Sequence, residues 1–221
     1  MQISRVKRSR NAAKGAYDRL SHIYDWLAGS SETQFMHLGL EMLAINAGET
    51  ILEIGSGTGK ALVELCHQVG ESSGQVHALD LSRGMLQKSQ ERMVSAGMQQ
   101  RVNLLEGDGV NLPYKSGSYS AVFICFTLEL FDTPEIPLVL EECRRVLAKD
   151  GRLGVVAILK TEQPGTIVRL YEWFHDRLPT YVDCRPIDGY RMIQAAGFRL
   201  EKRQMKSMWG LPVELVIASK V

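Results

Sequence analysis

The stretch from Thr50 to Lys60 reads TILEIGSGTGK, and it constrains the fold more than any other part of the chain. Its apolar residues Ile51, Leu52 and Ile54 form a short run that is typical of a strand buried on both faces. Three alternating glycines follow, and apolar residues then recur at helical spacing over residues 61–69. The stretch therefore predicts a strand, a glycine-rich loop and a helix. In a parallel sheet the loop lies at the carboxyl end of the strand, where open α/β sheets bind ligands.

Two phosphate-binding motifs do not fit this loop. A dinucleotide fingerprint requires a small residue at the position of Lys60. A P-loop requires Gly-Lys followed by Ser or Thr, whereas Gly59-Lys60 is followed by Ala61. Glu53 lies two positions before the first glycine, where a carboxylate would repel a pyrophosphate and attract a cationic ligand. The alternative is that Glu53 caps neighbouring backbone and that the glycines only form a turn.

The acid and the glycines together resemble motif I of the class I S-adenosylmethionine (SAM)-dependent methyltransferases. SAM carries a positive α-amino group and a positive sulfonium, which suit a carboxylate beneath the loop. The resemblance implies that SAM is the cofactor and that the loop binds it through Glu53, Gly55, Ser56, Gly57 and Gly59.

The next predicted strands also end in candidate cofactor residues. Asp80 follows the loop by about 20 residues, the spacing at which an acid reaches the ribose hydroxyls. The resemblance implies that Met85 covers the adenine and that Asp108 accepts from its amino group. The alternatives are an ordinary core methionine and an aspartate that closes a turn. A fourth strand is predicted over residues 118–127, and its carboxyl end is expected to point at the methyl group of bound SAM. The complete set predicted from these segments adds Leu81, Gly107, Gly109, Phe126 and Thr127.

The segment Tyr17-Asp18, followed by Ile23-Tyr24-Asp25, resembles the amino-terminal segment of the ubiquinone/menaquinone C-methyltransferase family. The resemblance implies that this segment packs over the methionine part of SAM and helps to form the acceptor pocket. Tyr17 is then a cofactor contact, and Tyr24 is the candidate catalytic residue. The alternative is that these tyrosines only pack a helical cover against the sheet.

The predicted fold is α/β, a Rossmann-like doubly wound sheet of seven strands, mostly parallel, with an antiparallel carboxyl-terminal hairpin. Residues 1–45 are expected to form a helical cover that includes a helix from Ser31 to Leu43, and residues 46–221 the SAM-binding domain. A helix is predicted from Pro134 and a fifth strand from Gly151 to Leu159. The hairpin is predicted as 198–205 and 213–219, joined by a turn at 209–212. An insertion around 161–190 resembles the substrate lid of such enzymes, and the candidate substrate contacts are Glu129, His175 and Arg185. A surface imidazole and a local ion pair are the alternatives for the last two.

Composition excludes several function classes. A formal charge of +1 gives no overall field that would attract nucleic acid. The four cysteines are widely separated and show no metal-binding spacing, so no metal site is expected. No apolar stretch of about 18 residues indicates a membrane span. A cytoplasmic location is expected. The cationic residues of segment 1–16 suggest peripheral contact with anionic lipid, although a solvated tail is the simpler interpretation.

The expected function is methylation of a small lipophilic acceptor, such as the carbon of a quinol precursor. Two alternatives remain open at this stage. One is N-methylation of a phospholipid headgroup such as phosphatidylethanolamine, which the basic amino-terminal segment could assist. The other is a SAM-binding protein without turnover, because cofactor binding does not prove catalysis.

Overall fold

The computed structural model describes residues 15, 18, 24–70, 74–161, 165, 168, 171 and 184–221, with the backbone alone for 24–31. Its strands are β1 (Thr50–Ile54), β2 (Gln75–Asp80), β3 (Val102–Glu106), β4 (Tyr119–Cys125), β5 (Leu147–Ile158), β6 (Phe198–Met208) and β7 (Leu211–Lys220). Its helices are α2 (Tyr24–Leu43), α3 (Lys60–Val69), α4 (Arg83–Ser95), α5 (Ile136–Val146) and α7 (Gly189–Ala195), with a short 3-10 helix, η1 (Leu128–Leu130).

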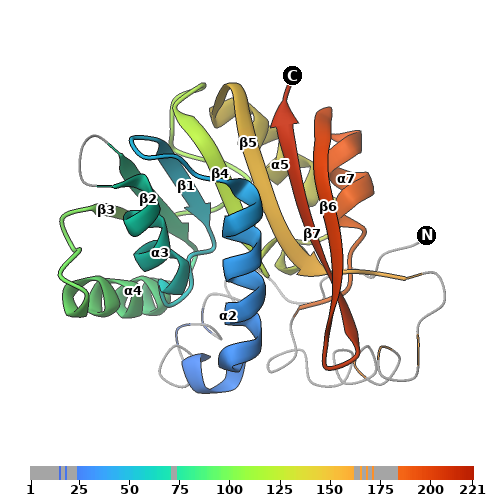
Figure 1. Ribbon diagram of the computed structural model, residues 1–221, viewed down its shortest axis with the longest axis horizontal. Coiled ribbons are helices and arrows are strands. Elements are labelled where there is room, and N and C mark those ends of the chain that lie inside the picture. The colour runs from blue at the N-terminus through green and yellow to red at the C-terminus, as the bar shows by residue number, and fades with distance from the viewer. Residues whose placement is uncertain are drawn as a thin grey trace.

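The strands form one seven-stranded sheet in the order β3-β2-β1-β4-β5-β7-β6 (Figure 1). The pairs from β3 to β5 are parallel, whereas β7 pairs antiparallel with both β5 and β6. The chain fills one side of the sheet with β2 and β3 and then returns to place β4 and β5 on the other side of β1. The structure thus confirms the predicted doubly wound sheet with its antiparallel hairpin.

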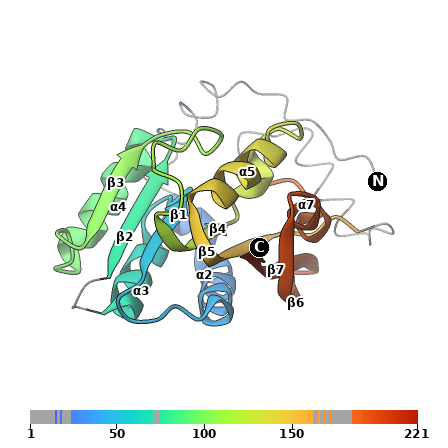
Figure 2. The same ribbon diagram turned by 90° about the horizontal axis from the view of Figure 1, so that it is seen from above.

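Helices cover both faces of the sheet (Figure 2). One hydrophobic core joins α2, α3 and α4 to one face, and its members include Leu43, Leu62 and Met93. A second core joins α5 and α7 to the other face, and its members include Leu140 and Ile193. Strand β4 is buried almost throughout because helices cover both of its faces.

The strand order reverses between β1 and β4, and this reversal positions the candidate site. Loops that follow β1 and β4 leave the sheet at the same edge and diverge, which opens a crevice at the carboxyl ends of the two strands. The glycine-rich loop after Ile54 and the segment after Cys125 face each other across this crevice.

Several predicted boundaries were wrong. The first described helix is longer than expected and starts at Tyr24, and α5 starts at Ile136, two residues after Pro134. Strand β5 begins at Leu147 because this residue pairs with Tyr119 before a register shift.

The carboxyl-terminal hairpin has a shorter turn than predicted. Its turn comprises Trp209 and Gly210, while Leu211 and Pro212 belong to β7. Both turn residues have positive φ angles, 52° and 87°, and a two-residue turn of this hand matches the twist of the flanking strands.

Candidate active site

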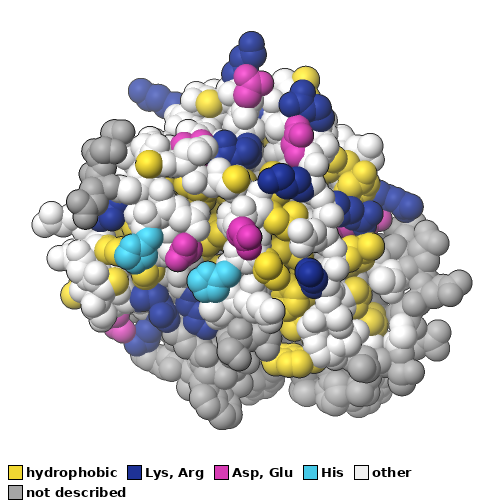
Figure 3. Space-filling view, viewed as in Figure 1, with side chains coloured by type: hydrophobic (Ala, Val, Ile, Leu, Met, Phe, Trp, Pro, Cys, Tyr) yellow, Lys and Arg dark blue, Asp and Glu magenta, His cyan; other side chains and the backbone are white. Residues whose placement is uncertain are grey.

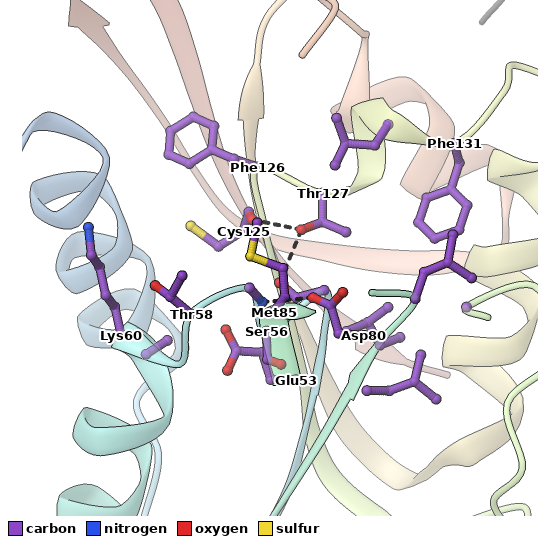
Figure 4. A pocket seen from close by; sticks show the side chains of 18 of the residues that line it. Glu53, Ser56, Thr58, Lys60, Asp80, Met85, Cys125, Phe126, Thr127 and Phe131 are labelled. Carbon is purple, nitrogen blue, oxygen red and sulfur yellow. Dashed lines mark hydrogen bonds between the residues drawn. The ribbon is translucent and has the colours of Figure 1, made fainter. Parts of the chain in front are cut away.

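A cavity of about 310 Å³ occupies the crevice at the carboxyl ends of β1, β2 and β4 (Figure 4). Side chains from separate segments, including Glu53, Asp80, Met85 and Thr127, surround one space in this view. Within the described chain, the predicted cofactor residues on the cavity wall are Glu53, Gly55, Ser56, Gly57, Asp80, Leu81, Met85, Gly107, Asp108, Gly109, Phe126 and Thr127. Gly59 does not line the cavity, although it belongs to the same loop.

The three glycines of the loop have different physical roles. All have positive φ, but a Cβ on Gly55 would lie 2.2 Å from Thr127 Cγ2, whereas a Cβ on Gly57 would meet nothing within 4 Å. Gly59 precedes α3, and its Cβ would approach Ser89 of α4. Gly55 therefore permits close packing against the β4 loop, Gly57 leaves backbone open to the cavity, and Gly59 lets two helices approach.

Hydrogen bonds hold the loop in this shape. Gly55 donates its N–H to the Leu79 carbonyl at 2.7 Å. From α4, Ser89 Oγ donates to the Gly57 carbonyl at 2.9 Å and Arg92 Nε donates to the Thr58 carbonyl at 2.8 Å. Because the carbonyls are engaged in this way, the backbone that faces the cavity is preorganised before any ligand binds.

Glu53 is the most unusual polar residue of the cavity. Its side chain is 3% exposed, and its Oε2 atom has no hydrogen-bond partner among the described residues. Ser56 Oγ is likewise buried without a partner in the described chain. Burial, with the negative charge of Asp80 as a second cause, raises the pKa of the Glu53 carboxyl well above its ordinary value. A buried acceptor of this kind fits a cationic donor from a ligand, as the α-amino group of SAM would provide.

Asp80 ends β2 and organises the opposite wall. Its carboxylate accepts from the Gly57 N–H at 2.8 Å and from the Ser82 N–H at 2.9 Å. Burial raises the pKa of Asp80 to about 6, although both backbone donors favour the charged form. The carboxylate therefore supports the glycine loop as well as facing the space predicted for a ribose.

Replacing Asp80 with alanine is expected to weaken SAM binding by about 1–3 kcal/mol, because the ribose hydrogen bonds and the support of Gly57 are lost together. Calorimetric titration with SAM measures this loss. Asn103→Ala, at an exposed position on β3, is a matched control and should leave the affinity unchanged. Equal affinity in the Asp80 variant would remove this residue from the site.

The sequence analysis did not assign Asp18 to the site, although the residue belongs to the recognised Tyr17-Asp18 pair. Asp18 Oδ1 accepts from Ser82 Oγ at 2.6 Å and from the Gly84 N–H at 2.9 Å, at the start of α4. Ser82 in turn caps α4 by accepting from the Met85 N–H. The amino-terminal motif thus contacts the helix that carries Met85. Asp18 and Ser82 are 64 residues apart in the chain, so no local sequence pattern signals this contact.

Phe126 adopts a positive φ of 47°, which is rare for a bulky side chain. It is buried, packs edge-to-face on Phe35 with 6.4 Å between ring centroids, and donates its N–H to the Val156 carbonyl. Thr127 Oγ1 donates to the Cys125 carbonyl at 2.9 Å. This strained segment brings the end of β4 against the glycine loop, and such strain is typical of functional sites.

Helix α2 supplies cavity residues that the sequence analysis missed. Glu32, Thr33 and Met36 line the cavity, although none belongs to a motif. A predicted helix could have indicated its buried face but not which part of that face meets the cavity.

The described wall of the cavity is strongly acidic. It has one lysine, Lys60, and six carboxyl groups, those of Glu32, Glu53, Asp80, Asp108, Asp132 and Glu135.

Glu129 and Arg185, two predicted substrate contacts, do not line the cavity. Both are fully buried. The Arg185 guanidinium donates to the carbonyls of Glu129 and Phe131 and to Thr133 Oγ1, at 2.6–3.2 Å. Glu129 Oε1 accepts from the Ile158 N–H. We therefore correct this expectation: Arg185 holds the segment after β4 against the chain near 185, Glu129 joins that segment to β5, and neither residue lies on the cavity wall.

Arg185→Lys is expected to lower the free energy of unfolding by about 1–2 kcal/mol, because one ammonium cannot reproduce the forked guanidinium contacts. Urea denaturation measures the change. Arg191→Lys, at an exposed position on α7, is the matched control and should be nearly neutral. An unchanged midpoint in the Arg185 variant would show that these hydrogen bonds contribute no net stability.

Three predicted site residues lie wholly or partly outside the described structure. Tyr17 and His175 lie outside the described residues, and Tyr24 is described only by its backbone at the start of α2. Most residues of the predicted lid, 161–190, also lie outside the described residues. Within the described residues, no group of three or more His, Cys, Asp or Glu side chains has the arrangement of a metal site.

Comparisons with known proteins agree with this geometry. A family profile described as a methyltransferase domain matches residues 51–151, from β1 to the start of β5. The demethylmenaquinone methyltransferase of Staphylococcus aureus is 32% identical over 214 residues, which cover 94% of this chain and 83% of that protein. The chain belongs to this methyltransferase family. Its relatives also include the demethylmenaquinone methyltransferases of Lactobacillus johnsonii (35% identical, 68% of this chain) and Porphyromonas gingivalis (30%, 67%). The matches span only 61% and 58% of those two proteins.

Solved structures show that this methyltransferase family shares a common fold with other proteins. A SAM-dependent methyltransferase from Aquifex aeolicus is 22% identical, covers 84% of this chain and 89% of its own, and gives a TM-score of 0.64. The cyclase SpnF covers 96% and 97%, with 17% identity and a TM-score of 0.77. At these identities the likeness concerns the fold alone, and proteins of this fold carry out more than one reaction.

The family assignment makes SAM the cofactor of this methyltransferase, and the residues of the cavity fit it. Glu53 and Ser56 present buried polar atoms that have no partner in the part of the chain that the structure describes, and Gly57 leaves space for a ligand where a side chain would stand. Among the described residues, no helix combines the length and apolar character needed to cross a lipid bilayer.

Proposed function

We propose that this methyltransferase transfers a methyl group from SAM to a carbon of a small lipophilic acceptor of the quinol class. The observation that carries the proposal is the buried Glu53 beneath the glycine loop, whose Oε2 atom has no partner among the described residues, in a cavity that also presents apolar walls. Relatives at 30–35% identity that are named demethylmenaquinone methyltransferases support the acceptor class. A 2-phytyl-1,4-naphtoquinone methyltransferase from Trichormus variabilis, 25% identical over 174 residues, supports it further.

The cofactor-binding part of the proposal assigns a role to each wall. Bound SAM supplies an electrophilic methyl group on a sulfonium. Glu53 binds the amino group, Asp80 the ribose and Asp108 the adenine edge, while Met85 covers the adenine face. These residues come from the ends of three neighbouring strands and from α4, so the sheet itself sets their spacing.

The remaining cavity wall suits an apolar acceptor. Met36, Phe126, Leu130 and Phe131 line it without belonging to the cofactor motifs of β1 to β3. An aromatic ring can pack against such side chains, which also exclude water from the reacting carbon. Proton removal from a ring hydroxyl would raise the nucleophilicity of that carbon. Glu32 on α2 is a carboxylate of this wall and adds a candidate base to Tyr24 and His175.

The decisive experiment supplies methyl-labelled SAM and two acceptor pools in detergent, one of isoprenoid demethylquinols and one of aminophospholipids. Mass spectrometry then identifies any product. A labelled quinol is the expected result, and Glu53→Gln and Asp80→Ala should reduce its formation. Labelled aminophospholipid alone would replace the proposed acceptor with an amine headgroup. The acidic wall, which would attract an ammonium group, makes this second pool worth testing.

The same experiment addresses a binding protein without turnover. Calorimetry with SAM and with S-adenosylhomocysteine is run on the same preparation. Tight binding of SAM without any labelled product would contradict the proposed reaction while leaving the cofactor site intact. Failure to bind SAM would contradict the cofactor assignments themselves.

A further inference from the structure

The tip of the β6–β7 hairpin exposes large apolar side chains. Trp209 in the turn is 72% exposed and Met205 on β6 is 62% exposed. An isolated exposed apolar residue needs no explanation, but here an indole and a thioether are only four residues apart on one protruding element. The tip is thus an apolar feature on the surface that folding leaves uncovered by the described chain.

Trp209 is also held in an unfavourable backbone conformation. Its φ of 52° lies in the left-handed region, where glycine or asparagine is the favoured residue of such a turn. The bulky residue therefore costs the fold energy and gains little burial in return. This combination indicates that Trp209 is at the tip for a reason other than folding stability.

Strand β6, which leads to the tip, is rich in positive charge, and Lys206 is its cation nearest the turn. The strand carries Arg199, Lys202, Arg203 and Lys206 and a single acid, Glu201. Arg199 and Arg203 are paired with carboxylates, whereas neither Lys202 nor Lys206 forms an ion pair within the described chain. Figure 3 shows lysine and arginine side chains mixed with hydrophobic ones on the part of this face that β6 and β7 occupy in Figure 1.

The hairpin projects at the edge of the sheet that carries the cavity. Strand β5 ends at Ile158, which pairs with Val213, and the hairpin continues four residues beyond this pair to Trp209. At about 3.3 Å per residue, the three steps from Val213 to Gly210 extend the hairpin roughly 10 Å past the carboxyl end of β5. The cavity opens at the carboxyl ends of the parallel strands, so tip and cavity share one edge of the sheet. Figure 1 shows the hairpin tip extending past the carboxyl end of β5.

We propose that the β6–β7 tip, defined by Met205, Lys206 and Trp209, docks this protein on the surface of an anionic phospholipid bilayer. Tryptophan favours the membrane interface, where its apolar ring enters the lipid and its N–H stays near water. Lysine beside it adds attraction to anionic headgroups. Docking at this edge turns the cavity toward the bilayer, which is the source of a lipophilic acceptor under the proposed function.

A second copy of the chain fits this surface less well. Edge pairing of two β6 strands would bring their lysines and arginines together, and such charges on an edge strand oppose strand addition. Two exposed side chains are also far below the roughly 800 Å² per partner of a stable protein interface. One indole is, by contrast, enough to add measurably to binding at a lipid surface that already attracts cations.

Vesicle co-sedimentation of the full chain tests the docking surface without SAM or turnover, so its outcome is independent of the proposed reaction. The vesicles contain phosphatidylcholine with phosphatidylglycerol, or phosphatidylcholine alone, at low ionic strength. We expect binding to the anionic vesicles. Trp209→Asn should weaken it at least about tenfold through the lost apolar burial, and Lys206→Glu at least about fivefold through the lost attraction.

Two control variants share the chemistry of these changes but lie elsewhere. Val94→Asn removes an exposed apolar side chain on α4, and Lys149→Glu reverses an exposed charge near the amino end of β5. Both should bind as the parent does. Because asparagine suits the left-handed turn, Trp209→Asn should unfold at an equal or higher temperature than the parent, which excludes misfolding as the cause of lost binding.

Three outcomes would overturn the proposal. The parent protein could fail to bind anionic vesicles, or Trp209→Asn could bind as well as the parent, which would assign binding to another segment such as the basic amino terminus. The third is a parent dimer that Trp209→Asn converts to a monomer, measured by sedimentation velocity, which would assign the tip to self-association.

Discussion

Gly55→Ala is expected to lower the free energy of unfolding by about 2–5 kcal/mol, a large part of the stability of a typical domain. An added Cβ would lie 2.2 Å from Thr127 Cγ2 and 2.4 Å from its hydroxyl, and the φ of 75° disfavours any side chain. Thr127 is held by the Cys125 carbonyl, so relief requires the end of β4 to move. Urea denaturation monitored by circular dichroism measures the loss.

Gly57→Ala is the matched control for this prediction. Its φ of 53° gives a similar backbone penalty, but its Cβ would meet nothing within 4 Å. The unfolding free energy should therefore fall by only about 1 kcal/mol. The added methyl group would stand in the cavity, so SAM affinity should fall even though the protein remains folded. If both variants lost the same stability, close packing of Gly55 against Thr127 would not be the cause.

Glu53→Gln is expected to act on stability and on binding in opposite directions. The raised pKa of Glu53 means that the folded state holds its proton more tightly than the unfolded chain does. The carboxyl therefore costs no stability below its ordinary pKa of 4.5 and costs increasingly more as pH rises toward the folded-state pKa. Glutamine has no proton to lose, so the cofactor-free variant should be more stable by about 1–3 kcal/mol at pH 8 and unchanged at pH 4.

The same substitution should weaken SAM binding between about tenfold and a hundredfold, the value of a charge-assisted hydrogen bond to the ligand amino group. In the parent protein, affinity should rise with pH as Glu53 ionises, whereas the affinity of the variant should lack this rise. Thermal unfolding at the two pH values and calorimetry across the range measure both effects. Glu64→Gln, on α3 and outside the cavity, should change neither quantity.

A Glu53→Gln variant that gains stability and loses SAM affinity would identify Glu53 as a binding residue that destabilises the fold. A variant that lost both stability and affinity would instead show that Glu53 is a structural residue of β1. A variant with raised stability and unchanged affinity would place the SAM amino group elsewhere in the cavity.

Much of the candidate site could be predicted because its residues lie at the ends of strands or directly after them. The run Ile51 to Ile54 predicts a buried strand, and Asp80 and Asp108 each follow a similar run. In a parallel sheet the carboxyl ends of such strands meet at one edge, so short-range patterns were enough to bring distant acids together. The antiparallel hairpin was predictable from a mostly apolar run over 213–218 that follows a turn containing glycine.

The sequence by itself thus determined the sheet, the glycine loop and most of the residues that line the cofactor cavity, because each depends on a pattern within about ten neighbouring positions. The tertiary structure alone decided how segments far apart in the chain meet. It placed Asp18 on the start of α4, brought Glu32 of α2 to the cavity, and engaged the Arg185 guanidinium with the loop after β4. These contacts depend on the packing of helices against the sheet, which leaves no periodic signal at the positions involved.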